Sequence, residues 1–348
     1  MPDAADSSPR LLRARAPLRV SFAGGGTDVP PYPAEQGGLV LSATINQYAY
    51  GTLRPRADRQ IGIQSLDLDA VASIALEDAR PEGDKLDLIK AAIQKLAADS
   101  PHGFDLFLHS AAPPGSGLGS SSAVMVTLVG LLSEHMKMPL TDYEKARLAY
   151  TVERQDLGLK GGTQDQYAAV FGGFNFMEFR ADEVIVNPLR IATETINELE
   201  YNLLLCFTGT TRVSDHIIDD QVGRYRSQES STVDGLGMQK ELATAMKDAL
   251  LRGQLTEFGT LLDRAWTSKK RMSPRISNEH IDELYEEAMR HGALGGKVTG
   301  AGGGGYMLLY CRYDCKHEVR GALAALGADA VEFQFDHTGL TTWSHQDD

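Results

Sequence analysis

The stretch Pro113–Ser122, which reads PPGSGLGSSS, lies between two apolar segments of the chain. Before it, Phe104–His109 has the apolar and aromatic composition of a β-strand, and after it Ala123–Leu132 has that of a buried helix. Glycines let a backbone approach a ligand closely, and a helix start offers unpaired N–H groups at the positive end of its dipole. We therefore interpret strand, glycine loop and helix as a cradle for nucleotide phosphates.

The serines that end this stretch leave three chemical roles open. The hydroxyls of Ser120–Ser122 can cap the helix, donate to phosphate oxygens or ligate a cation. Two rival phosphate motifs do not match, because the chain has no Gly-x-x-x-x-Gly-Lys-Ser/Thr sequence and its glycines lack the spacing of a dinucleotide fold. A nicotinamide-dependent oxidoreductase is thereby disfavoured. A glycine-rich connection without a ligand remains the structural alternative.

Composition narrows the class of protein. At 348 residues the chain is long enough for two domains, each with its own core. A net charge of −13 argues against binding nucleic acid or an anionic membrane through a broad basic surface, although a small cationic pocket is compatible with it. No apolar run has membrane-spanning length, residues 1–15 lack the apolar core of a signal peptide, and the three cysteines have no zinc-ligand spacing. We expect a cytoplasmic protein with a disordered tail at residues 1–15.

A second glycine-rich stretch follows the alternating segment Leu18–Ala23, which predicts an early strand. In Gly24–Tyr32, three consecutive glycines allow a close approach to something small, and polar side chains that suit sugar hydroxyls follow them. A surface turn explains the same composition equally well. If the stretch binds a sugar, the residues involved are Gly25, Gly26, Thr27, Asp28 and Tyr32.

Two acidic residues in the middle of the chain are candidates for chemistry. A capping box at Thr141–Glu144 opens a helix whose inward face includes Glu153, and a carboxylate on an apolar face needs a cationic partner, either Mg²⁺ or an arginine. That helix is expected to end near Leu157–Gly158. Asp165 lies where the loop 160–163 enters a short helix, and its spacing alone favours an acid that stabilises the helix start.

The second half of the chain is predicted to form a separate domain that begins between Val186 and Glu200. The cations of Lys269–Arg271 end one of its helices, either as a solvated cluster that the helix dipole favours or as a site for a phosphate on a substrate. A third glycine-rich stretch, Gly295–Gly305, is too dense in glycine for a mere hairpin, because each glycine costs folding entropy. We expect its backbone to pack against a ligand or against the phosphate loop.

The three glycine motifs, in this order, resemble those of the GHMP small-molecule kinases. The matching pieces are Ala16–Val20 with Gly24–Asp28, then Pro113–Ser122, and finally Gly295–Gly305, with the acid pair between the second and third. The resemblance implies an α+β fold of two domains. It places an ATP-binding α/β domain with a left-handed crossover in residues 16–195 and a ferredoxin-like domain in residues 196–348, with the active site in the cleft between them.

A narrower resemblance rests on two features. The first motif reads Gly-Gly-Gly-Thr-Asp where galactokinase and mevalonate kinase have Gly-Glu-His, and Gly162–Ala169 with Gly172–Phe176 is similar to the kinases of D-glycero-D-manno-heptose 7-phosphate. Those enzymes phosphorylate the anomeric hydroxyl to give the 1,7-bisphosphate, so this reaction is the expected function. Fucokinase and arabinokinase domains share parts of the pattern. A 1-kinase of an unphosphorylated sugar and a non-catalytic sugar-phosphate sensor on the same fold are therefore the alternatives.

The resemblance also implies roles for individual residues. Asp165 is expected to take the proton of the acceptor hydroxyl beside Arg19, and Mg²⁺ is expected to be held by Glu153 and by Ser121 or a serine next to it. ATP is expected to contact Pro114, Gly115, Ser116, Gly117, Leu118, Gly119, Ser120, Ser121 and Ser122. Besides the sugar contacts named above, the substrate sugar phosphate is expected to contact Gly162, Gly302, Gly303, Arg212, Lys269, Lys270 and Arg271. A homodimer is left open.

Overall fold

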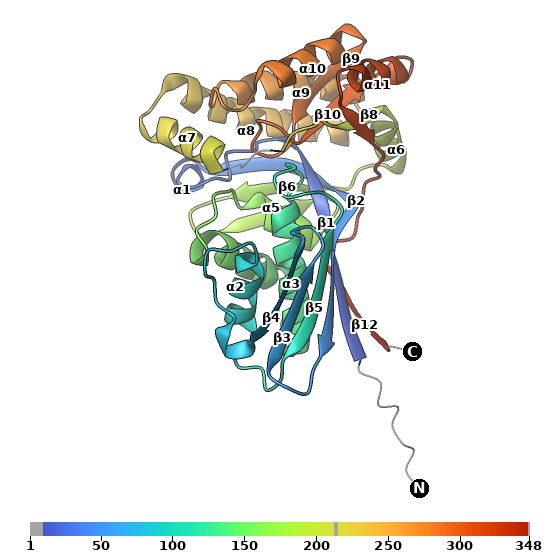
Figure 1. The fold of residues 1–348 in the computed structure, drawn as a ribbon. Helices are drawn as coiled ribbons and strands as arrows, with labels where there is room; N and C mark the ends of the chain where they lie inside the picture. Colours follow the sequence, from blue (N-terminus) through green and yellow to red (C-terminus); the bar gives the residue numbers. More distant parts are fainter. Residues whose placement is uncertain (1–9, 212–214, 347–348) are drawn as a thin grey trace.

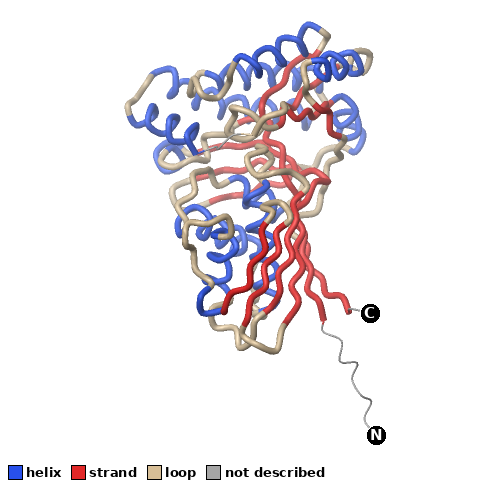
Figure 2. Tube along the Cα trace, viewed as in Figure 1, coloured by secondary structure: helices blue, strands red, loops and turns tan. Residues whose placement is uncertain are grey.

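The computed structural model describes residues 10–211 and 215–346, which form two packed units (Figure 1). The larger unit is built on an eight-stranded sheet and the smaller one on a four-stranded sheet. Figure 2 shows the long strands of the larger sheet running from one end of the molecule to the junction with the smaller unit. The expected α+β fold of two domains is confirmed.

The larger sheet is mostly antiparallel. Its strand order is β12-β1-β2-β5-β3-β4, with β6 paired to β2 and β7 paired to β6. Strands β3 and β5 form a parallel pair that is connected through β4 and α2, and the handedness of this crossover stays a prediction. The strands are β1 (Arg10–Ala23), β2 (Gly38–Pro55), β3 (Gln60–Ser65), β4 (Ala70–Ala75), β5 (Phe104–Ser110), β6 (Phe174–Phe179), β7 (Val184–Pro188) and β12 (Thr341–Gln346).

Helix α3 forms the core of the larger unit. Its sequence after the three serines is apolar on nearly every side, and it packs against β1 and β2 as well as against α2, α4 and α5. No helix in the described part of the chain is both long and apolar enough to cross a membrane. The helices of this unit are α1 (Tyr32–Gln36), α2 (Asp87–Leu96), α3 (Ser120–His135), α4 (Asp142–Tyr150) and α5 (Gln164–Phe171), with a 3₁₀ turn η1 (Leu76–Asp78).

Helix α4 begins at the predicted capping box but ends earlier than the sequence suggests. Thr141 Oγ1 accepts a hydrogen bond from Glu144 N at 3.3 Å, and Thr141 N donates to Glu144 Oε2 at 2.7 Å. After Tyr150 the chain continues as a π-helical turn, η2 (Thr151–Asp156), which carries Glu153. Such turns occur frequently at functional sites.

The smaller sheet is antiparallel with the order β11-β8-β10-β9. Helices lie between β8 and β9 and between β10 and β11, which is the β-α-β-β-α-β arrangement of a ferredoxin-like domain, as expected. Its elements are α6 (Thr193–Asn202), β8 (Leu203–Phe207), α7 (Asp215–Arg226), α8 (Ser230–Leu251), α9 (Leu255–Lys270), α10 (Glu279–Arg290), β9 (Ala293–Val298), β10 (Tyr306–Cys311), α11 (Lys316–Ala325) and β11 (Asp329–Val331).

Both ends of the described chain depart from the expected domain boundaries. Residues 10–15, expected in a disordered tail, belong to β1 and pair with Thr341–Gln346 of β12 (Figure 1). The last strand therefore belongs to the larger unit, and the expectation that residues 196–348 form one domain is wrong at its end. Phe335 begins this return with its ring 4.5 Å from that of Phe174. Strands that are consecutive in sequence usually pair, and β11 and β12 do not.

Candidate active site

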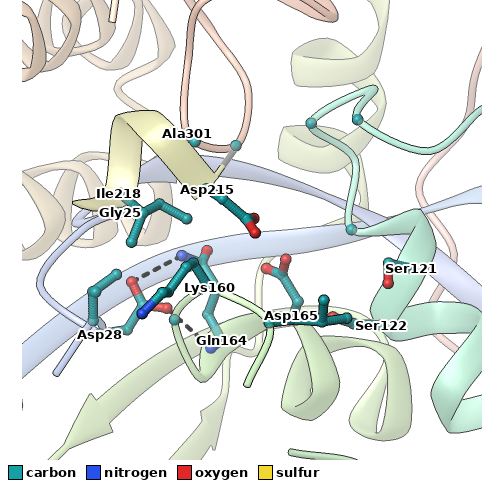
Figure 3. A pocket seen from close by; sticks show the side chains of 18 of the residues that line it. Gly25, Asp28, Ser121, Ser122, Lys160, Gln164, Asp165, Asp215, Ile218 and Ala301 are labelled. Atoms are coloured by element: carbon teal, nitrogen blue, oxygen red, sulfur yellow. Dashed lines mark hydrogen bonds between the residues drawn. The ribbon is translucent and has the colours of Figure 1, made fainter. Parts of the chain in front are cut away.

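A cavity of about 430 Å³ lies at the junction of the two units. Its walls come from the loop after β1, the loop before α3, the loop before α5, the start of α7 and the turn at Gly300–Ala301. In the view of Figure 3, Asp165 lies between Asp28 on one side and Ser121 and Ser122 on the other. Segments that are far apart in the sequence, including parts of all three glycine stretches, thus meet in one place.

The glycine loop before α3 is shaped to leave a helix start open. Gly115, Gly117 and Gly119 have φ values of 76°, 83° and 75°, which glycine adopts without strain. Gly119 is the N-cap of α3, and no side chain of the described residues caps that helix start. The first N–H groups of α3 are therefore available to an anion, as the sequence predicts.

Two residues of the loop have a structural role instead. Ser116 and Leu118 are buried and are absent from the cavity wall, in contrast to the expectation that they contact ATP. Their carbonyls hold the loop in place, because Ser116 O accepts from Tyr306 N and Leu118 O accepts from Arg19 N, both at 3.0 Å. The other expected residues do line the cavity, namely Pro114, Gly115, Gly117, Gly119, Ser120, Ser121 and Ser122.

The third glycine stretch supports this loop from behind. A Cβ at Gly300 would lie 2.7 Å from Gly117 Cα, and a Cβ at Gly305 would lie 2.2 Å from Ser116 O. Backbone therefore packs directly on backbone, which only glycine permits here. The expectation that the stretch packs against the phosphate loop is confirmed.

Glu153 is completely buried and is surrounded by donors. Its Oε1 accepts from Ser121 Oγ at 2.8 Å, and its Oε2 accepts from Ser122 Oγ at 2.7 Å and from Gln166 Nε2 at 2.6 Å. The Arg154 guanidinium lies 3.5 Å from Oε1. The two serines line the cavity and Glu153 lies behind them. Carboxylate and hydroxyl oxygens are hard donors of the kind that Mg²⁺ prefers, so this cluster fits the expected metal.

Asp165 is paired with Arg19 across the cavity floor. Arg19 Nε and Nη2 lie 2.8 Å and 2.7 Å from Asp165 Oδ1, and Arg19 Nη1 donates to Gly117 O at 2.5 Å. The arginine thereby connects the start of α5 to the phosphate loop. The spacing of Asp165 alone favours a helix-start acid, whereas the structure adds a cationic partner and an opening to the cavity.

Lys269 supplies a second cation to the same place. Its side chain is only 3% exposed, and its Nζ donates to Gly300 O. Burial and, to a smaller degree, the nearby Arg19 lower the pKa of Lys269 to about 8, although Asp28 and Asp165 act in the opposite direction. Of the three consecutive cations Lys269–Arg271, only Lys269 lines the cavity.

Asp28 is held in a fixed orientation at the opposite wall. Its Oδ1 accepts from Gln164 Nε2 at 3.0 Å and from Gly26 N at 3.1 Å, and its Oδ2 accepts from Gln164 N at 3.1 Å. Burial raises the pKa of Asp28 and Asp165 adds to the rise, whereas these hydrogen bonds lower it. A Cβ at Gly162 would lie 1.8 Å from Asp28 Oδ2, so glycine is required there. Gly25, Gly26, Asp28 and Gly162 all line the cavity, as expected.

Two other residues expected to contact the substrate have side chains that serve the fold and do not line the cavity. Thr27 Oγ1 donates to Gly24 O at 2.7 Å, and the Tyr32 ring packs 5.2 Å from that of Tyr225. Neither Thr27 nor Tyr32 lines the cavity.

Two of the expected cations and two glycines of the third stretch also do not line the cavity. Lys270 pairs with Asp282 at 3.1 Å and Arg271 with Asp234 at 3.6 Å, both outside the cavity. Successive residues of a helix point about 100° apart, so Lys269 faces the cavity and its neighbours do not. Gly302 and Gly303 pack on Ile276, whose carbonyl accepts from Gly303 N at 2.8 Å. Arg212 lies outside the described residues.

Several cavity residues were not singled out from the sequence. The loop before α5 contributes Lys160 and Gly161, and the first residue of α5 is Gln164. All three lie next to Gly162, which the sequence had already singled out. Helix α7 carries no motif, and only the packing of the two units brings it to the cavity. Figure 3 shows Asp215 of this helix pointing toward Asp165. The missed residues are Val29, Arg154, Leu159, Lys160, Gly161, Gln164, Thr211, Asp215, Ile218, Gln221, Gly300 and Ala301.

An anion cradle, a buried carboxylate beside serine hydroxyls, and an aspartate opposite them are the parts of a phosphotransferase site. Comparisons with known proteins agree with that class. Residues 87–173 match the family model of the GHMP kinases N terminal domain, and residues 246–329 match that of the GHMP kinases C terminal domain. The chain belongs to the GHMP kinases.

Among characterised relatives, the D-glycero-alpha-D-manno-heptose 7-phosphate kinase of Campylobacter jejuni is 38% identical over 96% of this chain and 99% of its own. The crystal structure of a D-glycero-D-manno-heptose 1-phosphate kinase from Bacteroides thetaiotaomicron superposes with a TM-score of 0.80 at 37% identity, covering 95% of this chain and 98% of that one. The bifunctional fucokinase/GDP-fucose pyrophosphorylase of Arabidopsis thaliana is more distant, at 30% identity over 87% of this chain and 30% of its own.

Proposed function

We propose that this protein is an ATP-dependent sugar kinase that phosphorylates the anomeric hydroxyl of D-glycero-D-manno-heptose 7-phosphate to give the 1,7-bisphosphate. The observation that carries the proposal is the placing of Asp165 and Arg19 next to the start of α3. A methyl group at Gly119, the N-cap of that helix, would lie 3.5 Å from both Asp165 Oδ2 and Arg19 Cγ. The full-length similarity to a heptose 7-phosphate kinase supports the choice of substrate.

In this proposal the triphosphate of ATP lies over the loop Gly115–Gly119, against the open N–H groups of α3. Mg²⁺, when bound, would neutralise negative charge on the phosphates. Ser121, backed by Glu153, would hold it. The described residues contain no group of three or more His, Cys, Asp or Glu side chains fit for a metal. Mg²⁺ keeps several waters and takes phosphate oxygens as ligands in sites of this kind, so one or two protein oxygens suffice to hold it.

Asp165 is proposed to accept the proton of the acceptor hydroxyl. Arg19 offsets the charge of Asp165, and together with Lys269 it stabilises the negative charge that spreads over the transferring oxygens. An ordinary aspartate is a weak base, but phosphoryl transfer depends mainly on positioning, because its loose transition state needs little deprotonation. An anomeric hydroxyl is also more acidic than a simple alcohol.

Asp28 is proposed to bind hydroxyls of the heptose, and Lys160 to bind its phosphate. Lys160 lines the cavity with its side chain half exposed, and its Nζ lies 3.6 Å from Asp219 of α7. A weak, exposed ion pair of this kind can be exchanged for a phosphate at little cost. We also propose that the protein is cytoplasmic, with support from its buried free cysteines, which suit a reducing compartment.

The test is a coupled ADP-release assay with heptose 7-phosphate, unphosphorylated heptose, fucose, arabinose and galactose as acceptors. We expect the highest kcat/KM with the 7-phosphate, and NMR of the product should place the new phosphate on carbon 1. A preference for an unphosphorylated sugar would support the alternative 1-kinase. ADP release with none of them, together with sugar-phosphate binding, would indicate a sensor.

Replacing Lys160 by methionine tests the phosphate contact. The Lys160→Met variant should raise KM for heptose 7-phosphate by roughly tenfold or more, as expected for a lost charge-assisted hydrogen bond. The KM for unphosphorylated heptose should stay the same. Lys85→Met, at an exposed lysine that does not line the cavity, is the matched control. An equal rise of KM for both sugars would remove Lys160 from phosphate recognition.

A further inference from the structure

We propose that Gln166 is a positioning residue that orients Glu153 and Ser121 for the metal ion and thereby sets the metal affinity of the site. The inference rests on the proposed function only in taking these two residues as the metal site. Gln166 lies in the first turn of α5, is completely buried and does not line the cavity. Any effect it has on the reaction must therefore pass through its neighbours.

The contacts of Gln166 occupy one side of the Glu153 carboxylate. Gln166 Nε2 donates to Glu153 Oε2 at 2.6 Å and lies 3.1 Å from Ser122 Oγ, which itself donates to Oε2 at 2.7 Å. With Oε2 held by two donors, the carboxylate cannot rotate freely. Oε1 is then directed at Ser121, whose hydroxyl gives its hydrogen to Oε1 at 2.8 Å. The lone pairs of Ser121 Oγ are left for a cation in the cavity.

The chemistry of an amide suits this place better than that of other donors. A lysine or arginine would also bind Oε2, but it would add a second positive charge beside the Arg154 guanidinium, which already lies 3.5 Å from Oε1, and would leave less negative charge to attract Mg²⁺. Because a carboxylate only accepts, the Nε2 group must face Glu153, which leaves the amide oxygen turned away. That oxygen, Gln166 Oε1, is buried and has no hydrogen-bond partner among the described residues. An unpaired buried acceptor costs about 1–3 kcal/mol, so stability alone does not explain a glutamine here.

Gln166 also connects the metal site to the proposed base. It follows Asp165 directly in the chain, and the two side chains diverge, one to Glu153 and the other to Arg19. The first turn of α5 therefore determines the separation between the metal site and the base. Two residues earlier, Gln164 of the same turn holds Asp28 through its own amide at 3.0 Å. This second glutamine provides a matched control.

The experiment measures metal affinity without turnover. Mn²⁺ is titrated into the full-length protein saturated with ADP and followed by EPR, for the wild type, Gln166→Met and Gln164→Met. Residues that orient a metal ligand typically contribute 10–100-fold to metal affinity. We expect Mn²⁺ binding to weaken by that factor in Gln166→Met and to remain unchanged in Gln164→Met, which should instead raise KM for the sugar. ADP binding in EDTA should be the same in all three proteins.

Two outcomes overturn the inference. Unchanged Mn²⁺ affinity in Gln166→Met would show that the amide does not orient the metal site, and a parallel loss of ADP binding in EDTA would indicate a collapsed phosphate loop. If Gln166→Met does not fold, Gln166→Asn takes its place, because its amide is one methylene too short to reach Oε2. A wild type that binds Mn²⁺ but phosphorylates no sugar would refute the proposed function while the titration still decides the role of Gln166.

Discussion

Four charged side chains meet at the centre of the cavity, and each depends on the others. Arg19 and Lys269 bring positive charge, while Asp28 and Asp165 bring negative charge. Removing one member of a buried ion pair leaves its partner uncompensated, at a cost of about 3–5 kcal/mol. Informative substitutions at this centre therefore keep the shape of the side chain and change only its charge or its proton.

The first prediction at this scale concerns the base. Asp165→Asn keeps an oxygen that Arg19 can donate to, but it removes the group that accepts the proton. We expect kcat to fall by roughly 10²–10⁴-fold, the usual contribution of a positioned general base. ATP affinity, measured by titration calorimetry, should change little. Asp99→Asn, at an exposed position, is the control and should leave kcat unaltered; near-normal turnover of Asp165→Asn would exclude it as the base.

The second prediction concerns the effect of Lys269 on the pH dependence of kcat/KM. Because burial lowers its pKa to about 8, Lys269 loses its charge as the pH rises through that value, well before a free lysine would. The kcat/KM of the wild type should therefore fall above about pH 8. Lys269→Arg, which stays protonated, should shift this alkaline limb to higher pH. If kcat/KM falls at the same alkaline pH in the wild type and in Lys269→Arg, a group other than Lys269 causes the fall.

The lowered pKa of Lys269 also affects stability: activity is expected to fall as the pH rises, whereas the free energy of unfolding is expected to increase. Between the folded pKa of about 8 and the ordinary lysine pKa, the unfolded chain binds the proton that folded Lys269 has released. This group therefore adds to the free energy of unfolding as the pH rises through that window. Urea titrations at two pH values should show a smaller alkaline gain in a Lys269→Met variant.

At the scale of elements, the glycine stretches work as a stack. The backbone of the third stretch packs on the backbone of the phosphate loop, and the phosphate loop leads directly into the start of α3. A side chain added in the third stretch should therefore weaken nucleotide binding, although it would not touch the nucleotide.

Gly300→Ala tests this arrangement. The new Cβ would lie 2.7 Å from Gly117 Cα, and the φ of +66° costs a non-glycine residue about 1–2 kcal/mol by itself. We expect a raised KM for ATP and a lower midpoint of urea unfolding. Gly321→Ala in α11, where a Cβ meets nothing within 4 Å, is the matched control and should stabilise by about 0.5–1 kcal/mol. An unchanged KM for ATP in Gly300→Ala would show that the third glycine stretch does not influence nucleotide binding by the phosphate loop.

At the scale of the whole molecule, the two units are joined by buried contacts. Lys297 of β9 is completely buried, and its Nζ donates to Ser21 O of β1 at 2.7 Å. Gly24 N donates to Gln239 Oε1 of α8 at 3.1 Å. The return of the chain to β12 adds a third connection. Because neither unit satisfies these groups alone, we expect the described chain to unfold as one cooperative body.

Phe335 tests the part played by the returning segment. Its ring is 8% exposed and packs among Phe22, Phe174 and Phe333. Phe335→Ala should lower the free energy of unfolding by roughly 3 kcal/mol, the lower end for a buried phenylalanine. Urea denaturation followed by circular dichroism measures it. Phe107→Ala, at a ring that is 39% exposed, should cost less, and an equal loss in both variants would contradict the anchoring role.

The parts of the site that could be predicted are those whose residues lie close together in the sequence. The phosphate loop was predictable from glycines and serines that act within ten residues of one another. The pairing of Asp165 with Arg19 joins residues 146 positions apart, and the spacing of Asp165 alone pointed elsewhere. Helix α7 was missed because it reaches the cavity only through the packing of the two units, for which the chain offers no local signal.

Local chemistry in the chain was therefore enough to predict the phosphate cradle and the capping box, because glycine freedom, hydroxyl donors and helix starts act over a few residues. The kinase family followed from the resemblance of three glycine motifs to those of known kinases. Long-range packing alone selected Lys269 from its cationic run, turned Thr27 and Tyr32 into the core and paired β12 with β1. Helix phase and strand partners depend on contacts between distant segments, and these contacts form only when the whole chain folds.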